Sequence, residues 1–575
     1  MILQALKEYY DRKASDPESD IAPEGWEKKE IPFIIVLDHA GNLMQIEDTR
    51  EGEGKKKRAK AFLVPQAEKK TSGIAANLLW ENAGYVLGIA TKGNNERAIK
   101  QKNAFIDRLT NELGDIKVVQ AVIAFLTNVT EERLSQEECW QEISASNPNL
   151  SFRMSADSFL ICRHPDVVSR LSSTSQSSND ISGTCLVTGK NARIKVLHTS
   201  IKGVYGAQTA GANIVSFNLD AFKSYGKEQG FNAPVGAEAE FSYTTAINTL
   251  LGRDSKQRLL IGDASTVFWS KKQSSFESEF SSFFEEPEKD NPDAGTQNVK
   301  ALFESIHSGA YREDDGKTPF YILGLAPNAA RIAVRFWQIG TIAEIAVRIH
   351  QYFKDFAIVK PPREPEYYSI WRILVNIATQ DKSENIPPNL AGDFMRSILT
   401  GMPYPATLLQ AVLRRIRSDT ENRVKPVRAA LIKAYLNRYY QFYPDQNQRE
   451  VQMELDISQP SIGYQLGRLF ATLEKIQEEA NPGINATIRE RFYGAACATP
   501  VTVFTNLLRL KNHHLAKLDN KGRVVNFERL LGEIIGNLKD FPAQLDLHEQ
   551  GRFAIGYYHQ RQDFFTSKGV AESDK

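Results

Sequence analysis

The chain has 575 residues, of which 25% are charged and 42% hydrophobic, so it can bury several cores and is not a disordered protein. Its formal net charge is +1, from 71 basic and 70 acidic side chains, which argues against a sequence-independent DNA-binding protein that works alone. The four cysteines form no C-x-x-C pair and no run of 18 apolar residues occurs, so neither a structural zinc site nor a membrane span is expected.

Short apolar segments separated by polar loops predict an α+β first half. Helices are expected over residues 2–10, 92–113 and 234–251. Strands are expected over 31–37, 43–46, 320–325 and 331–337, with further short apolar segments over 62–64 and 85–89 and short strands with Gly turns over 185–217. Ser-rich loops are expected over 169–184 and, followed by acidic residues, over 271–298.

From about residue 340 the pattern becomes helical, and two apolar stripes over residues 462–476 and 527–538 predict an antiparallel helical bundle at the end. The expected fold is therefore an irregular mixed region of short strands and helices followed by this bundle. Four parts are predicted: an N-terminal α+β region (1–168), a central mixed region (185–338), a helical connector (340–450) and the C-terminal bundle (453–575).

The charges are unevenly distributed along the chain. Residues 50–103 carry twelve basic and five acidic side chains, and residues 401–450 carry nine and four. Residues 276–293 carry seven acidic side chains and one lysine. Two basic zones in a nearly neutral chain suit a subunit that meets phosphate on some faces only.

Several long strings are unusual enough to point to a family: MILQALKEYYDR at the start, CLVTG and its continuation over 185–226, NAPVGAEAEFSYTTAINTLL over 232–251, GDASTVFW over 262–269 and LGLAPNAARIAVRFW over 323–337. In order and spacing they resemble the large subunit of the type I-C CRISPR surveillance complex (Cascade), the Csd-type large-subunit family, across essentially the whole chain.

This resemblance implies a non-catalytic subunit in an RNA-guided complex, where guide RNA reads the sequence and protein reads a short flanking motif. The implied partners are guide RNA and the backbone subunits, double-stranded target DNA and its displaced single strand, a recruited helicase-nuclease and a small subunit. Recognition of the protospacer-adjacent motif and support of R-loop formation follow from the same resemblance. No cofactor and no membrane contact are expected. Because Glu8 and Asp11 interrupt the apolar start that a signal peptide needs, a cytoplasmic location is expected.

Two polar loops in the first basic zone are candidates for DNA contact. The basic run can neutralise phosphates, and the second loop offers donors that reach base edges or phosphate; a solvated loop and a polar turn are the alternatives. The candidate residues are Lys55, Lys56, Lys57, Arg58 and Lys60 in the first loop, and Lys69, Lys70, Thr71, Ser72, Asn77 and Asn82 in and near the second.

Residues 202–211 form a Gly-rich loop whose missing side chains would let backbone N–H groups approach phosphate, unless the glycines only serve tight turns. It is not a P-loop, since no GK[ST] ends it. The candidate residues here are Lys202, Gly203, Gln208, Thr209 and Asn213.

Arginines and one lysine further along could hold phosphates or the displaced strand, with surface salt bridges as the alternative. Alternation predicts that Arg331 and Arg335 share one strand face, opposite Ile332, Val334 and Phe336. The second basic zone adds Arg414, Arg415, Arg417, Arg423, Lys425 and Arg428.

The acidic and histidine pairs Asp38-His39, Asp263 and His513-His514 match no metal-binding or hydrolase spacing, so neither a catalytic nor a metal-binding residue is predicted. Two alternatives stay open: a metal-dependent nuclease that uses Asp38 or Asp263, and an assembly scaffold that does not read DNA.

In the resembled family, a separate small subunit can arise by internal translation initiation within the same gene. Met453 is the candidate start, just before the predicted bundle, and Arg449-Glu450 could be encoded by a purine-rich ribosome-binding sequence. The alternative is that Met453 is an ordinary interior residue.

Overall fold

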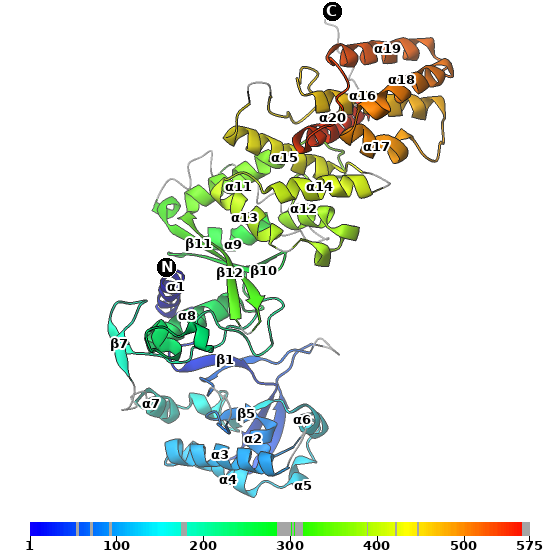
Figure 1. Cartoon of the computed structure of the whole chain (residues 1–575). Helices are drawn as coiled ribbons and strands as arrows, with labels where there is room; N and C mark the ends of the chain where they lie inside the picture. The colour runs from blue at the N-terminus through cyan, green and yellow to red at the C-terminus, as the bar shows by residue number, and fades with distance from the viewer. Residues whose placement is uncertain are drawn as a thin grey trace, which may run out of the picture. The chain divides into compact units, whose positions relative to one another are not determined.

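The computed structural model describes residues 1–52, 57–68, 73–90, 95–173, 181–284, 301, 304, 314–329, 331–387, 389–419, 423–445 and 448–565. The chain forms two compact units, Met1–Ile201 with Val215–Thr249 and Lys202–Ile214 with Leu250–Lys575. Short strands are concentrated in the first half and helices in the second, which confirms the predicted α+β class (Figure 1). The finer division into four parts stays a prediction.

The first unit is built around a four-stranded sheet of order β3-β2-β6-β5. β2 (Phe33–Leu37) is buried at all five positions, as its uninterrupted apolar sequence requires. It pairs antiparallel with β3 (Leu43–Asp48) and parallel with β6 (Asn149–Met154). β5 (Trp80–Asn82) completes the sheet beside β6.

Helices and two small strand pairs complete the first unit. The predicted helices at both of its ends are confirmed as α1 (Ile2–Ala14) and α8 (Ala237–Leu250), and the described part of the predicted helix 92–113 is confirmed by α3 (Asn95–Leu113). The remaining elements are β1 (Trp26–Glu30) with β4 (Ala61–Pro65), α2 (Ala83–Leu87), α4 (Lys117–Asn128), α5 (Glu131–Leu134), α6 (Trp140–Ser146), α7 (Pro165–Ser173), and β7 (Ser182–Thr184) with β8 (Asn191–Arg193). The loop expected over 169–184 is wrong at both ends, because α7 and β7 enter it.

The second unit contains an antiparallel sheet of order β12-β11-β10-β9. Its strands are β9 (Arg258–Ile261), β10 (Ala264–Ser270), β11 (Pro319–Asn328) and β12 (Arg331–Thr341), and the last two confirm the predicted strand pair. The connector expected over 271–298 is wrong at its start. There α9 (Phe276–Glu279) and the 3-10 turn that follows bury four phenylalanines in the core.

Five helices continue the core of this sheet. They are α11 (Ile342–Phe356), α12 (Ile370–Ile377), α13 (Leu390–Thr400), α14 (Ala406–Ser418) and α15 (Pro426–Phe442). Thr341 begins α11 with a capping box, since its hydroxyl accepts from the Glu344 N–H and the Glu344 carboxylate accepts from the Thr341 N–H. One apolar cluster extends from β9 through these helices to Tyr558, so the last helices of the chain share this core.

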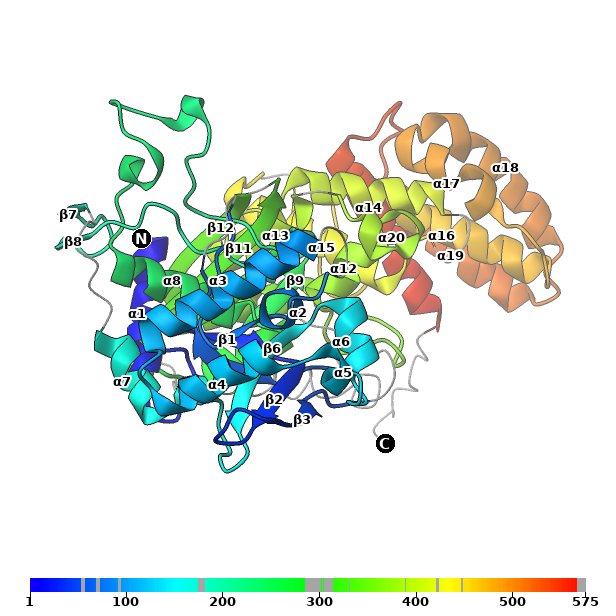
Figure 2. The same cartoon turned by 90° about the horizontal axis from the view of Figure 1, so that it is seen from below.

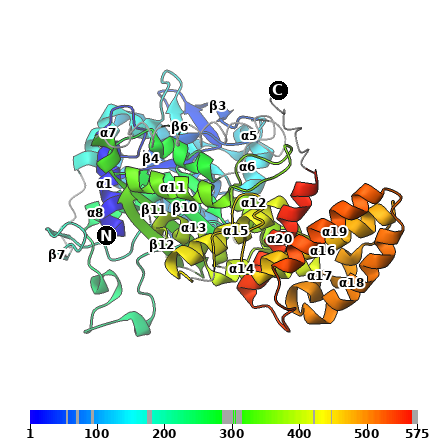
Figure 3. The same ribbon diagram turned by 90° about the horizontal axis from the view of Figure 1, so that it is seen from above.

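The C-terminal bundle consists of α16 (Ile462–Ala480), α17 (Ile488–Ala498), α18 (Val501–Ala516), α19 (Lys521–Gly536) and α20 (Leu547–Phe565) (Figure 3). Successive helices run in opposite directions, as predicted. Glu474, late in α16, bonds to Thr487 at the start of α17, whereas Phe470 meets Tyr493 further along α17. The first and last helices therefore run parallel to each other.

Glycines set the distance between α16 and α20. A Cβ atom on Gly467 would lie 2.1 Å from the Phe553 carbonyl oxygen, and one on Gly556 would lie 2.1 Å from the Tyr464 carbonyl oxygen. Real side chains do not tolerate such contacts, so these positions allow the two backbones to touch. Closing the bundle this way also buries Gly551 of α20 against Ile432 of α15.

Substituting Gly467 by alanine should therefore destabilise the bundle. The methyl group meets the backbone of α20, and we expect a loss of about 1–3 kcal/mol or more from overpacking. Gly494→Ala is the matched control, because a Cβ there meets nothing within 4 Å and alanine favours the helix. The thermal unfolding midpoint of the full chain is measured for both variants. A Gly467→Ala midpoint at or above that of Gly494→Ala would contradict the close approach of α16 and α20.

A buried histidine in the same contact predicts a pH dependence. Burial lowers the pKa of His559 to about 3, and its Nδ1 lies 2.9 Å from the Tyr464 hydroxyl. Since the unfolded chain protonates near pH 6.5 and the folded chain does not, stability should fall as pH drops below about 6.5, by about 2 kcal/mol at pH 5.

The titration is isolated by comparing His559→Gln with the wild type between pH 7.5 and 5. The wild-type melting temperature should fall more steeply over this range than that of the variant, which has no group to protonate. Parallel profiles would show that His559 is not kept neutral by the fold.

Candidate nucleic-acid interface

The Gly-rich loop, residues 202–214, is held tightly on the sheet of the second unit. The Tyr205 N–H donates to the Ser265 hydroxyl of β10 at 2.8 Å. Gly203 has a φ of +84°, and a Cβ there would lie 2.8 Å from the Leu251 carbonyl oxygen. The positive φ and the close approach to Leu251 both require glycine at residue 203. Together with the Tyr205 hydrogen bond, they give the loop one defined backbone path.

The end of this loop meets the turn between β11 and β12. Asn213 forms a parallel bridge with Arg331, and its carbonyl oxygen accepts from the Ile332 N–H at 3.1 Å. A Cβ on Gly206 would touch Pro327 in the same turn. The structure thus brings together two candidates that are far apart in sequence, Asn213 and Arg331. The exposed polar side chains of the loop are Lys202, Gln208 and Thr209.

A β-bulge changes the arrangement predicted for β12. Val334 pairs with Leu325 and Phe336 pairs with Gly324, so Arg335 is an extra residue between them. Because their partners are consecutive in β11, Val334 and Phe336 lie on opposite faces; Val334 is 42% exposed and Phe336 is 5% exposed. The prediction of one apolar face over these residues is therefore wrong, because strict alternation cannot anticipate a bulge.

Arg335 is already paired within the protein. Its Nη2 donates to Asp263 at 2.7 Å, and its own carbonyl oxygen accepts from Arg396 at 3.1 Å. Both partners of the ion pair are partly exposed, so a phosphate could compete for the guanidinium. Asp263, one acid of the nuclease alternative, acts here as a counterion.

Only part of the first basic zone can be placed. Lys55, Lys56, Lys69, Lys70, Thr71 and Ser72 lie outside the described residues. Lys57, Arg58 and Lys60 are exposed. The backbone of Arg58 is bonded in both directions to Glu51, and the Lys60 ammonium lies 5.8 Å from the centre of the Phe62 ring. These three side chains remain compatible with phosphate contact.

Two asparagines predicted to read bases have structural roles instead. Asn77 is buried, and its side-chain oxygen accepts from the Glu68 N–H at 2.9 Å. Asn82 caps α2 by accepting from the Tyr85 N–H and donates to Glu81 at 3.2 Å. Burial of Asn77 contradicts the prediction that its amide reaches a base edge; Asn82 is half-buried, with its amide bonded within the fold.

The second basic zone is largely internal. Arg423 and Arg428 are buried: Arg423 donates to carbonyl oxygens of α14, and Arg428 pairs with Asp419 at 2.6 Å. Their assignment to a surface for the displaced strand is therefore wrong. Arg415 and Lys425 both pair with Asp381. Arg414 and Arg417 are exposed, and Arg417 donates to Gln550.

The sequence did contain a signal for this burial. Residues 427–436 of α15 are apolar on all sides of the helix apart from Arg428 and Lys433, and every one of them is buried. A helix that is hydrophobic all round lies inside a protein, so its cations need internal partners.

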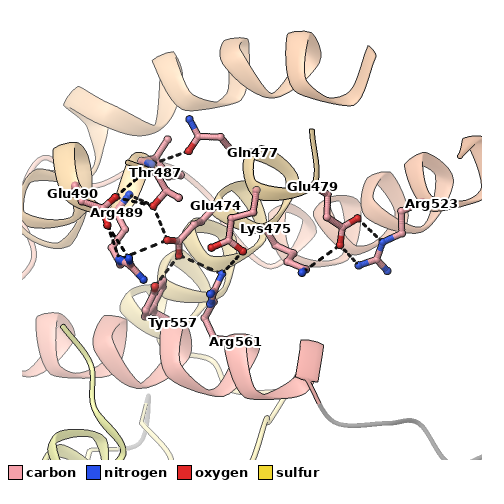
Figure 4. A network of polar contacts seen from close by, with 12 residues as sticks. Glu474, Lys475, Gln477, Glu479, Thr487, Arg489, Glu490, Arg523, Tyr557 and Arg561 are labelled. Carbon is pink, nitrogen blue, oxygen red and sulfur yellow. Dashed lines mark hydrogen bonds and ion pairs between the residues drawn. The ribbon is translucent and has the colours of Figure 1, made fainter. Parts of the chain in front are cut away.

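A polar network in the C-terminal bundle is also structural (Figure 4). The buried carboxylate of Glu474 accepts from the Thr487 hydroxyl at 2.8 Å and from the Tyr557 hydroxyl at 2.7 Å. Arg489 and Arg561 each lie 3.7 Å from it. Burial raises the pKa of Tyr557, which keeps this hydroxyl a donor. The network therefore joins α16, the start of α17 and α20.

Removing the central carboxylate should loosen these helices. Glu474→Ala leaves Arg489 and Tyr557 without their shared acceptor, and we expect a loss of about 3–5 kcal/mol. Glu479→Ala is the control, because its partner Arg523 is partly exposed and such pairs contribute about 0–1 kcal/mol. Amide hydrogen exchange of α16 and α20 is measured in both variants. Equal protection in Glu474→Ala and Glu479→Ala would contradict a central role of Glu474.

The remaining acidic and histidine candidates form no site. The Asp38 carboxylate accepts from two backbone N–H groups and from the Asn42 side chain, and these bonds lower its pKa. Within the described ranges, no three His, Cys, Asp or Glu side chains lie close enough to hold a metal ion. No helix in the part of the chain that the structure describes is long and apolar enough to cross a membrane.

A family model described as CRISPR-associated protein (Cas_Csd1) matches residues 6–565, which is nearly the whole chain. No curated protein matches the sequence.

Proposed function

The chain belongs to the Cas_Csd1 family of CRISPR-associated proteins, and from this membership we propose that it is the large subunit of a type I-C Cascade surveillance complex. In RNA-guided effectors, base pairing reads the sequence and protein reads a short flanking motif. We propose that this chain recognises the protospacer-adjacent motif in double-stranded DNA, supports R-loop formation and catalyses no reaction itself.

The observation that carries this proposal is the Gly-rich loop fixed on the β11–β12 turn. Its defined backbone holds Lys202, Gln208 and Thr209 at the surface, close to where Asn213 meets Arg331. A lysine and an arginine suit phosphates, and a glutamine amide suits a base edge. Preorganised donors of this kind favour binding, because little freedom is lost when DNA is held.

The other partners are proposed from the family. They are guide RNA and the backbone subunits, the displaced strand, the helicase-nuclease and the small subunit. Because Arg423 and Arg428 are buried, we retain the exposed Arg414 and Arg417 of α14 as the candidates from that zone for the displaced strand.

Internal initiation at Met453 would produce a chain that contains the complete five-helix bundle. Met453 precedes α16, and the α16–α20 contact and the Glu474 network lie entirely after it. A separate product would expose the face of α20 that packs on Ile432 of α15. Such a face suits a small subunit that docks on a neighbouring chain.

The two alternatives predict different results. A metal-dependent nuclease would require purified protein to cleave DNA with magnesium and to lose this activity on substitution of Asp38 or Asp263, although each carboxylate already has partners within the fold. An assembly scaffold would leave DNA binding unchanged by any loop substitution.

The proposal is tested by binding of the assembled complex to targets with altered flanking bases. Gln208→Ala should reduce discrimination between flanking motifs by about 1–3 kcal/mol if its amide contacts a base. Lys202→Ala should weaken binding to all targets and reduce the slope of log K against log salt by about one.

Lys382→Ala serves as control, since Lys382 is an exposed lysine outside the loop. Unchanged affinity, flank preference and salt slope in both loop variants and in a Lys69→Ala/Lys70→Ala variant would favour the scaffold. A complex lacking this chain that binds targets with the same strength and preference would refute the proposal altogether.

A further inference from the structure

A tight turn in the first unit presents a tyrosine to solvent. Tyr225 is 97% exposed, the highest value among the large hydrophobic side chains of the described residues. Tyr225 and Gly226 have φ values of +51° and +68°, and the Lys227 N–H donates to the Ser224 carbonyl oxygen at 3.0 Å. Two successive positive φ angles closed by this bond are the features of a type I′ turn.

Tyrosine is an unfavourable residue for this position. The first central position of a type I′ turn favours Asn, Asp or Gly, and a bulky side chain with positive φ is a rare outlier. Strained backbone of this kind, with a fully exposed aromatic ring, persists where the strain serves a function. Stability alone would place asparagine at residue 225.

The turn is held in place rather than free to move. The Asn232 side chain accepts from the Ser224 N–H at 2.9 Å and donates to the carbonyl oxygens of Lys227 and Gln229 at 3.2 and 3.0 Å. Gly230 binds the base of the turn to the neighbouring segment, since its N–H donates to the Val196 carbonyl oxygen at 3.1 Å. Figures 2 and 3 show this segment as the green loop that projects beside β7. These hydrogen bonds therefore fix the backbone that carries the ring.

The segment that carries the ring, residues 220–232, has two acidic side chains and two lysines. The two acids that flank the turn, Asp220 and Glu228, both pair with Lys223, at 2.9 and 3.1 Å. Lys227, next to the turn, is exposed. An exposed aromatic ring beside an exposed lysine suits a polyanion with flat, unpaired bases better than it suits an apolar protein surface.

We propose that Tyr225 stacks on an unpaired base of the nucleic acid that this protein engages. The assignment deepens the proposed function and rests on it, because an opened DNA fork supplies such bases. Stacking needs the ring but not its hydroxyl group, and it tolerates any base since every base has a flat face.

Four variants of the assembled, guide-bearing complex test the assignment. Tyr225→Asn removes the ring but suits the turn, so we expect an unchanged or higher melting temperature together with about 5- to 100-fold weaker binding to a target with an open fork. Tyr225→Phe should bind like the wild type, and Tyr225→Leu should bind like Tyr225→Asn. Leu219→Ala, at an exposed apolar residue of the same segment, is the control and should bind normally.

A direct readout comes from 2-aminopurine placed at successive positions of the fork. Its fluorescence should change at one position in the wild type and in Tyr225→Phe, and not in Tyr225→Asn. Wild-type and Tyr225→Asn complexes that bind equally and give equal fluorescence would overturn the stacking inference alone. If Tyr225→Asn prevented assembly of the complex but left DNA contacts normal, the turn would be a protein-docking site. That result would also overturn the stacking inference. A wild-type complex that binds no target would refute the proposed function, and the stacking with it.

Discussion

The direct contact between the backbones of α16 and α20 is the constraint on which the C-terminal half depends. These are the first and last helices of a five-helix bundle, and Gly467 and Gly556 allow them to approach until Cβ atoms would collide with main chain. Once they touch, Glu474 becomes buried and needs the donors that surround it. The same closure places α20 on α15, so the bundle and the helices before it share one core.

Close backbone contacts also fix the path of the proposed DNA-binding loop. Gly203 lies against Leu251, and the Asn213 carbonyl bonds to the start of β12, so the loop has a fixed path without large side chains of its own. A fixed path lets a few exposed side chains act as a site, because their positions do not have to be ordered on binding. The strained turn at Tyr225 is fixed in the same way, because the Asn232 side chain accepts from the Ser224 N–H.

The positive charges divide into two groups with different roles. Arg423 and Arg428 have partners inside the fold, where an unpaired guanidinium would be costly to bury, whereas the partly exposed Arg335 pairs with Asp263. Lys202, Arg414, Lys57 and Lys60 are exposed. A local count of basic residues does not separate these groups, because burial depends on which helix face meets the core.

Sequence alone determined the class, the family and the positions of several strands and helices. The apolar run of β2, the β11–β12 pair and the amphipathic stripes of the last helices are local patterns, and long unusual strings carried the family resemblance. Tertiary structure decided which faces of these elements are buried and which side chains pair. The bulge at Arg335 placed Val334 and Phe336 on opposite faces of β12, and packing on all sides of α15 buried Arg428. Asn77 is buried, and Asn82 caps α2 rather than facing a base. Side-chain roles depend on neighbours that are remote in the chain, and only the folded chain brings them together.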